Sequence, residues 1–217
     1  VDPSTPVTDA ALAGALAAIL QQCAGVGRPV QLPAWGSDVG KAVRVEEVGS
    51  AEAGSAVLAA IDAFKGRGGC VLLVYAALLT RGVDQVKTDV MVDMGEPPLV
   101  VGPHRICSSE LMALLLKGVA SGNFGAQNAT NTAGNDWPPA LGVGMLSSSE
   151  LEGSMTICNA LKSPAQPVWV LHGGDHFTLA WAAAAGGAGD GEGPPTVPST
   201  TPSEFILYHW NGLPPHG

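Results

Sequence analysis

Residues 168–181 read VWVLHGGDHFTLAW, and this stretch decides how the C-terminal third of the chain folds. Two apolar runs are joined through Gly173 and Gly174, a pattern that predicts a β-hairpin. Because side chains alternate across a strand, His176 is expected at the start of the second strand, on the face opposite Phe177. The stretch therefore predicts a hairpin with a histidine beside its turn.

A third strand is predicted at 205–210, followed by a turn at Asn211 and Gly212. Apolar residues at helical spacing, with capping residues and closing glycines, predict helices further upstream. These helices are 10–23 capped by Asp9, 50–64 opened by Ser50, 70–81 closed by Gly82, and 110–117 capped by Ser108 or Ser109 and closed by Gly118. The fold class predicted is α+β, with helices packed on a small antiparallel sheet.

Two further strands are expected at 30–32 and 42–48. In the second, Val43 and Val45 alternate with charged residues, which is typical of a half-buried strand. The Gly-, Asn- and Ala-rich residues 119–140 predict a long loop, and 183–204 predict a disordered low-complexity insertion.

A chain of 217 residues has the length of a single domain, 1–217. It starts with Val1 rather than Met, so we expect it to be a piece of a longer protein.

Composition argues against several classes of protein. The net charge is −9, and the ten basic residues are scattered, so no nucleic-acid partner is expected. The longest apolar runs have 11 and 10 residues, short of the ~20 that a membrane span needs. The four cysteines form no Cys-x-x-Cys pair, and we interpret them as reduced thiols of an intracellular protein, cytoplasmic or nuclear.

His176 is the residue most suited to chemistry. A histidine after a tight turn can serve as a general base, and Asn211 at the end of the next strand can hold its tautomer, as in a Cys-His-Asn arrangement. Cys70 follows two glycines at a predicted helix start, where a thiol becomes more acidic. The alternatives are a structural histidine and a buried core cysteine.

Two other patterns are weaker. His172 and His176 have the spacing of zinc ligands on a helix, but the glycines between them disfavour a helix there. The sequence Gly66-x-Gly68-Gly69 lacks the Gly-Lys-Ser/Thr ending of a phosphate-binding loop and indicates a plain loop. We therefore expect no metal and no cofactor, with a zinc hydrolase kept only as a third option.

Four blocks of sequence resemble the MINDY family of deubiquitinases. Residues 68–82, GGCVLLVYAALLTRG, are similar to a Gly-Cys-Ile-Leu-Leu-x-Tyr-Ser-x-x-Leu-Ser-Arg-Gly segment. Residues 105–118, RICSSELMALLLKG, resemble Gly-Tyr-Cys-Thr-Gln-Glu-Leu-Val-Asn-Leu-Leu-Leu-Thr-Gly. Residues 160–181 resemble a stretch from Phe-Leu-Lys-Thr-Pro through Pro-Ile-Trp-Val-Val to His-Phe, and 205–213, FILYHWNGL, resemble Phe-Asp-Leu-Tyr-Tyr-Tyr-Asp-Gly-Leu. The blocks keep the family order and are most similar to the branch with the larger catalytic domain.

The resemblance implies part of a papain-like cysteine protease fold that hydrolyses isopeptide bonds in polyubiquitin. It implies that His176 is the catalytic histidine and that Asn211 takes the place of a family Asp, without its negative charge. The family nucleophile lies in a Gly-Pro-Cys motif, which does not occur in residues 1–217, and Cys70 matches a family cysteine that is not the nucleophile. The four family residues before the histidine, Cys-Ser-Glu-Ser, are here HGGD at 172–175.

Two functions follow as expectations. In the first, the chain is the His-bearing part of a cysteine-type deubiquitinase whose nucleophile lies upstream of Val1. In the second, it is a catalytically inactive MINDY-like module that binds ubiquitin or another protein within a larger assembly. Ubiquitin or polyubiquitin is the expected partner in the first case.

Overall fold

The computed structural model describes residues 6–34, 44–90, 99–102, 106–122, 124, 142–174, 176–184 and 205–212. The chain divides into two compact units, residues 3–122 in one and residues 123–217 with residues 1–2 in the other. Both contain helices and small sheets, which confirms the α+β class. That residues 1–217 form a single domain stays a prediction.

The first unit is mainly helical, and its first helix is its longest element. They are α1 (Asp9–Ala24), β1 (Val30–Ala34), β2 (Arg44–Val48), the 3-10 turn η1 (Ser50–Glu52), α2 (Ala53–Ala59), α3 (Ile61–Lys65), α4 (Gly69–Arg81), α5 (Val83–Asp89), β3 (Val100–Val101), β4 (Ile106–Cys107) and α6 (Ser109–Lys117). Strands β1 and β2 pair antiparallel, as do β3 and β4.

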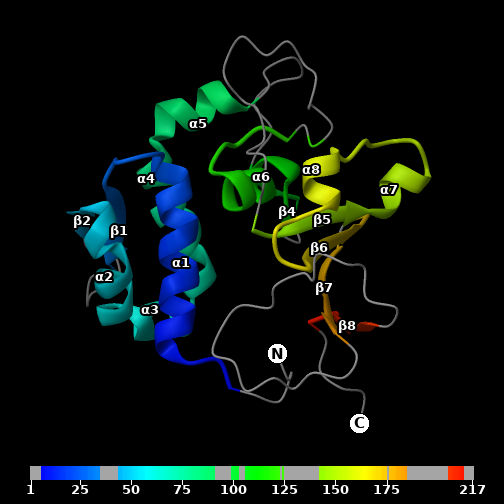
Figure 1. Cartoon of the computed structure of the whole chain (residues 1–217). Helices are drawn as coiled ribbons and strands as arrows, with labels where there is room; N and C mark the ends of the chain where they lie inside the picture. Colours follow the sequence, from blue (N-terminus) through cyan, green and yellow to red (C-terminus); the bar gives the residue numbers. More distant parts are fainter. Residues whose placement is uncertain are drawn as a thin grey trace. The chain divides into compact units, whose positions relative to one another are not determined.

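Helix α1 lies at the centre of the first core, beside α2, α4 and α6 (Figure 1). Its apolar stripe buries Leu16, Leu20 and Cys23 against residues such as Val57 of α2 and Leu114 of α6. An apolar stripe of this spacing stabilises a helix through tertiary packing rather than through propensity.

Three predictions for this unit are corrected. The N-cap of α1 is Thr8, whose hydroxyl accepts a hydrogen bond from the Ala11 N–H, and Asp9 is instead the first helical residue. The helix expected over 50–64 is broken, because the backbone leaves helical geometry at Ala60 (φ −101°, ψ 10°). The alternation expected in β2 does not bury Val45, which is 43% exposed; Val43 lies outside the described residues.

Gly118 closes α6, as the sequence predicts, and it also allows a close approach between helices. Its φ is +75°, and a Cβ there would lie 2.1 Å from the Gln22 carbonyl oxygen. The end of α1 therefore meets the end of α6, where the Gln22 side-chain amide donates to the Leu116 carbonyl over 2.8 Å.

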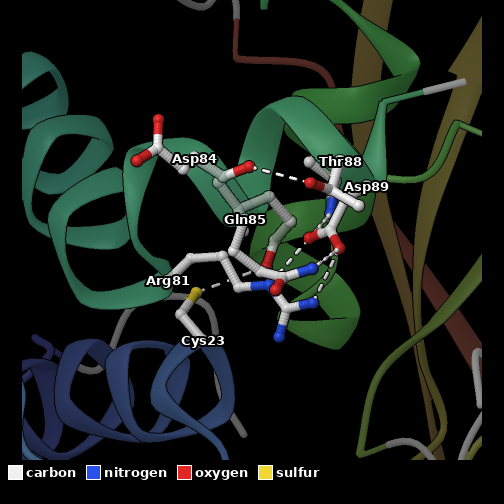
Figure 2. A network of polar contacts seen from close by, with 8 residues as sticks. Cys23, Arg81, Asp84, Gln85, Thr88 and Asp89 are labelled. Carbon is white, nitrogen blue, oxygen red and sulfur yellow. Dashed lines mark hydrogen bonds and ion pairs between the residues drawn. The ribbon is translucent and has the colours of Figure 1, made fainter. Parts of the chain in front are cut away.

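An ion pair between the half-buried Arg81 and the buried Asp89 lies at the corner between α4 and α5, which are bent by 87° (Figure 2). The Arg81 guanidinium donates two hydrogen bonds to the Asp89 carboxylate, at 2.7 and 2.8 Å. The same carboxylate accepts from the Gln85 amide over 3.0 Å and from the Ala120 N–H over 3.3 Å. One buried side chain thus joins α4, α5 and the segment after α6.

The second unit contains one four-stranded sheet and two short helices. Its elements are β5 (Gly144–Ser147), α7 (Ser148–Leu151), α8 (Asn159–Lys162), β6 (Val168–Gly173), β7 (His176–Ala184) and β8 (Phe205–Trp210). The strand order is β5-β6-β7-β8 (Figure 1). Met145, Ile157 and Leu161 are its largest fully buried side chains after Phe124.

The hairpin predicted at 168–181 is confirmed, with Gly173 opposite His176 and Gly174 at a φ of +67°. The sheet is mixed rather than antiparallel, because β5 pairs parallel to β6. A parallel pair needs a crossover connection, and α7 and α8 lie within it. Gly144 of β5 packs closely against the main chain of α8, since a Cβ there would lie 2.3 Å from the Leu161 carbonyl oxygen.

Strand β8 pairs with β7 and forms one edge of the sheet among the described residues. The large apolar side chains of Phe205, Ile206, Leu207 and Trp210 are between 46% and 61% exposed. The insertion predicted at 183–204 begins later than expected, because the backbone of 183 and 184 continues β7 and pairs with β8. Residues 185–204, and all of the loop predicted at 119–140 except 119–122 and 124, lie outside the described residues.

Among the described residues, no single helix is long and apolar enough to cross a membrane. The bent pair α4 and α5 passes that test together, by length and composition only, and α4 buries Leu72, Ala76 and Ala77 in the first core.

Candidate active site

His176 is the first residue of β7 and its side chain is exposed. The pairing of β7 with β6 places His176 and Thr178 on one face of the sheet and Phe177 on the other. The imidazole therefore adds little to the core and is accessible to another molecule.

The ring of His176 is oriented by the main chain that follows β8. Its Nε2 lies 3.2 Å from the carbonyl oxygen of Asn211. A carbonyl can only accept, so Nε2 carries the proton and donates it, and Nδ1 of the neutral ring is unprotonated. The sequence predicts that Asn211 orients the ring of His176. In the structure the atom that contacts the ring is the main-chain carbonyl oxygen of Asn211. Nδ1 is thus the nitrogen able to accept a proton.

A pocket of about 410 Å³ opens beside His176. Its walls come from β5, α7 and the β6–β7 hairpin, and the residues that line it are Leu146, Ser147, Ser148, Leu151, Leu171, His172, Gly173, His176 and Thr178. None of these nine is Asp, Glu, Lys or Arg. The lining of the pocket therefore carries no carboxylate, ammonium or guanidinium group. Sequence reasoning missed it, because β5 has only four residues and twenty residues separate it from its neighbour β6 in the chain.

The helix that forms one wall of the pocket is held in place by Glu150. Its carboxylate accepts from the Lys162 ammonium over 2.7 Å and from the Ile157 N–H over 3.0 Å. These two hydrogen bonds, with the Lys162 charge, lower the pKa of Glu150 below its usual range. The carboxylate thus ties α7 to α8.

His172 has a partner of its own. Its Nδ1 lies 2.8 Å from the Ser147 hydroxyl, which already accepts from the Ser149 N–H, and its ring lies 5.0 Å from that of Phe177. The described residues contain no group of three or more His, Cys, Asp or Glu side chains placed to hold a metal ion. His104 and Asp175 lie outside them.

All four cysteines are free thiols. Burial raises the pKa of Cys23 to about 12, against a smaller lowering by Arg81. Burial and then the charge of Glu110 raise the pKa of Cys107 to about 11. Cys158 is buried, whereas Cys70 is exposed in the first turn of α4, which corrects the buried-core reading of this residue. Cys70 belongs to the first unit and His176 to the second.

Residues 41–187 match the family model described as "Deubiquitinating enzyme MINDY-3/4, conserved domain". This segment contains His176 and ends before β8 and Asn211.

Similar curated proteins are named as ubiquitin carboxyl-terminal hydrolases. The human protein named probable ubiquitin carboxyl-terminal hydrolase MINDY-4 is 29% identical over 154 residues, which cover 67% of this chain and 19% of that protein. The Danio rerio protein named ubiquitin carboxyl-terminal hydrolase MINDY-3 is 30% identical over 134 residues, 59% of this chain and 29% of that protein. The chain thus spans about a fifth to under a third of the length of these relatives. No solved structure matches it.

Proposed function

Because this chain belongs to the MINDY-3/4 family of deubiquitinating enzymes, we propose that it is the His-bearing part of a cysteine-type deubiquitinase. Its substrate would be polyubiquitin, its fold part of a papain-like protease, and its nucleophilic cysteine would lie upstream of Val1. The relatives' names support ubiquitin as the substrate, and their greater length leaves room for the nucleophile. The free thiols support an intracellular location, cytoplasmic or nuclear.

The observation that carries the proposal is the exposed imidazole of His176, anchored through Nε2 beside a pocket. In the proposed reaction, Nδ1 removes the thiol proton, and the thiolate attacks the isopeptide carbonyl. The imidazolium then gives this proton to the leaving lysine amine as the C–N bond breaks. In the second step, Nδ1 takes a proton from water, whose oxygen attacks the thioester, and returns it to the thiolate that leaves.

The test is His176→Ala in the full-length protein. We expect the rate of polyubiquitin cleavage to fall by orders of magnitude, because the general base is lost. The thermal midpoint should change little, because the side chain is exposed. The matched control is His209→Ala, which removes another exposed imidazole from the neighbouring strand, 3.0 Å from Thr178. An unchanged rate in His176→Ala would falsify the assignment, and a large fall in midpoint would indicate a structural histidine.

A second test uses the 217-residue chain by itself. We expect no cleavage of polyubiquitin, because the proposed nucleophile lies upstream of Val1. Steady cleavage that is lost in Cys70→Ala would show that the exposed thiol of α4 is the nucleophile.

The second candidate function is a catalytically inactive module that binds ubiquitin or another protein. The Asn at position 211, where the family has an Asp, favours it. Binding of polyubiquitin by a full-length protein that does not cleave it would support this alternative and reject the first.

A further inference from the structure

We propose that Asn211 is a site of spontaneous deamidation, and that the imidazole of His176 speeds the reaction through its hydrogen bond to the Asn211 carbonyl. The modification converts the side-chain amide to a carboxylate and adds one negative charge beside the candidate base. The inference goes beyond the proposed function and does not depend on it, because the reaction needs no substrate other than water.

The first argument is the local sequence. The chain contains six asparagines, and Asn211 is the one that a glycine follows. In deamidation the main-chain nitrogen of the next residue attacks the asparagine side chain, so a following residue without a Cβ hinders the attack least. Gly212 has a φ of +72°, a conformation that favours glycine, so the turn itself requires the small residue that the reaction favours.

The second argument is the position of the pair in the fold. Asn211 and Gly212 are both exposed, so water reaches them. Trp210 is the last residue of β8, and the pairing of β8 with β7 ends there, opposite Leu179. The peptide group between Asn211 and Gly212 therefore lies beyond the paired strand, where the side-chain amide and the next nitrogen can rotate toward each other.

The third argument is the contact with His176. Its Nε2 donates a hydrogen bond to the Asn211 carbonyl oxygen over 3.2 Å, and this carbonyl belongs to the same peptide group as the Gly212 nitrogen. When that nitrogen loses its proton, resonance places negative charge on the carbonyl oxygen. A hydrogen bond to an ionised acceptor is stronger than one to a neutral acceptor. His176 therefore stabilises the reactive form of the peptide group more than its resting form.

The reaction balances without an oxidant or a cofactor. The Gly212 nitrogen forms a bond to Cγ of Asn211, the Cγ–Nδ2 bond breaks, and ammonia leaves with the proton of the Gly212 N–H. Water then opens the resulting succinimide at either of its two carbonyls. The products are aspartate and isoaspartate, and each carries a new carboxylate at position 211, next to the ring of His176.

The test of the site is peptide mapping by mass spectrometry of the 217-residue chain after incubation in mildly alkaline buffer. We expect the acid to accumulate at position 211, and the exposed Asn159, which Ala160 follows, to stay an amide as the internal control. Asn211→Gln keeps the main-chain carbonyl and an amide but should stay unmodified, because its attack closes a less favoured six-membered ring. An unchanged amide at 211 after a short peptide of residues 208–215 has fully converted would overturn the proposed site.

The role of His176 is tested by substitution. His176→Ala should slow the conversion about fivefold, the factor that a hydrogen bond of about 1 kcal/mol gives. His176→Gln, whose side-chain amide can also donate, should recover part of the rate. The matched control is His209→Ala, which removes the exposed imidazole bonded to Thr178 and should convert like wild type. Equal or faster conversion in His176→Ala would overturn the assignment to His176. Neither measurement uses polyubiquitin, so failure of the proposed function would leave both results unaffected.

Discussion

The contact between His176 and Asn211 predicts how much activity an Asn211 variant retains. The observed partner is a main-chain carbonyl, which Asn211→Ala retains. We expect this variant of the full-length protein to lose less than about tenfold in cleavage rate, far less than His176→Ala. The ¹⁵N shifts of the imidazole should still report the Nε2–H tautomer. A loss as large as that in His176→Ala would mean that the side-chain amide does the orienting.

The buried thiol of Cys23 predicts how stability depends on pH. Its folded pKa is about 12, above the value of 9.0 for a free thiol. Between these values the unfolded chain has released the proton and the folded chain has kept it, so the free energy of unfolding falls as pH rises, by up to about 1.4 kcal/mol per unit.

Urea unfolding at pH 8 and pH 10 checks this prediction. Cys23→Ala should show a smaller loss of stability between the two pH values than wild type, whereas Cys70→Ala, at an exposed thiol, should lose as much as wild type. Equal losses in wild type and Cys23→Ala would contradict the assignment to Cys23.

The contacts at the α4–α5 corner predict which carboxylate of α5 contributes most to the stability of the fold. Asp89→Ala leaves the Arg81 guanidinium, whose side chain is only 17% exposed, without its partner. We expect a loss of about 3–5 kcal/mol in the free energy of unfolding. The matched control is Asp84→Ala in the same helix, because the Asp84 side chain is fully exposed and lies 3.7 Å from Lys87. This control should stay within about 0.5 kcal/mol of wild type in denaturant titrations, and similar losses in both variants would reject the role given to Asp89.

Local signals explain which elements the sequence predicts well. The hairpin at 168–181 and the α6 caps at Ser108 and Gly118 depend on residues adjacent in the chain, and both form as predicted. Two other features depend on distant or absent signals. Twenty residues separate β5 from its parallel partner β6. The helix break occurs at Ala60, with no Gly or Pro at that position, and alanine has the highest helix propensity, so the sequence carries no signal for the break.

In the candidate site, too, features with a local sequence signal are predictable and contacts between distant residues are not. Strand alternation predicts which face His176 occupies, because the period of a strand is fixed. It cannot predict that the Asn211 carbonyl, thirty-five residues away, meets the ring, or that Leu146 and Leu151 line a pocket beside it. Those contacts depend on strand order and register, which residues far apart in the sequence set together.

At the scale of the whole molecule, each unit buries apolar side chains of its own. Leu20, Val57 and Leu114 belong to the first, and Met145 and Leu161 to the second. The site residues described above, from Leu146 to Asn211, all lie in the second unit. We therefore expect stability variants such as Asp89→Ala and activity variants such as His176→Ala to be separable in experiment.

The exposed apolar edge at β8 has a consequence for how the chain behaves at high concentration. An apolar edge strand is a template for pairing with another copy, and charge repulsion is what opposes such aggregation. The net charge disappears near pH 4.8, so light scattering of the 217-residue chain should rise as pH falls toward that value. Leu207→Lys places a charge on the edge strand and should suppress the scattering, whereas Leu58→Lys, on a helix, should not. Equal scattering by these two variants would mean that another surface drives the aggregation.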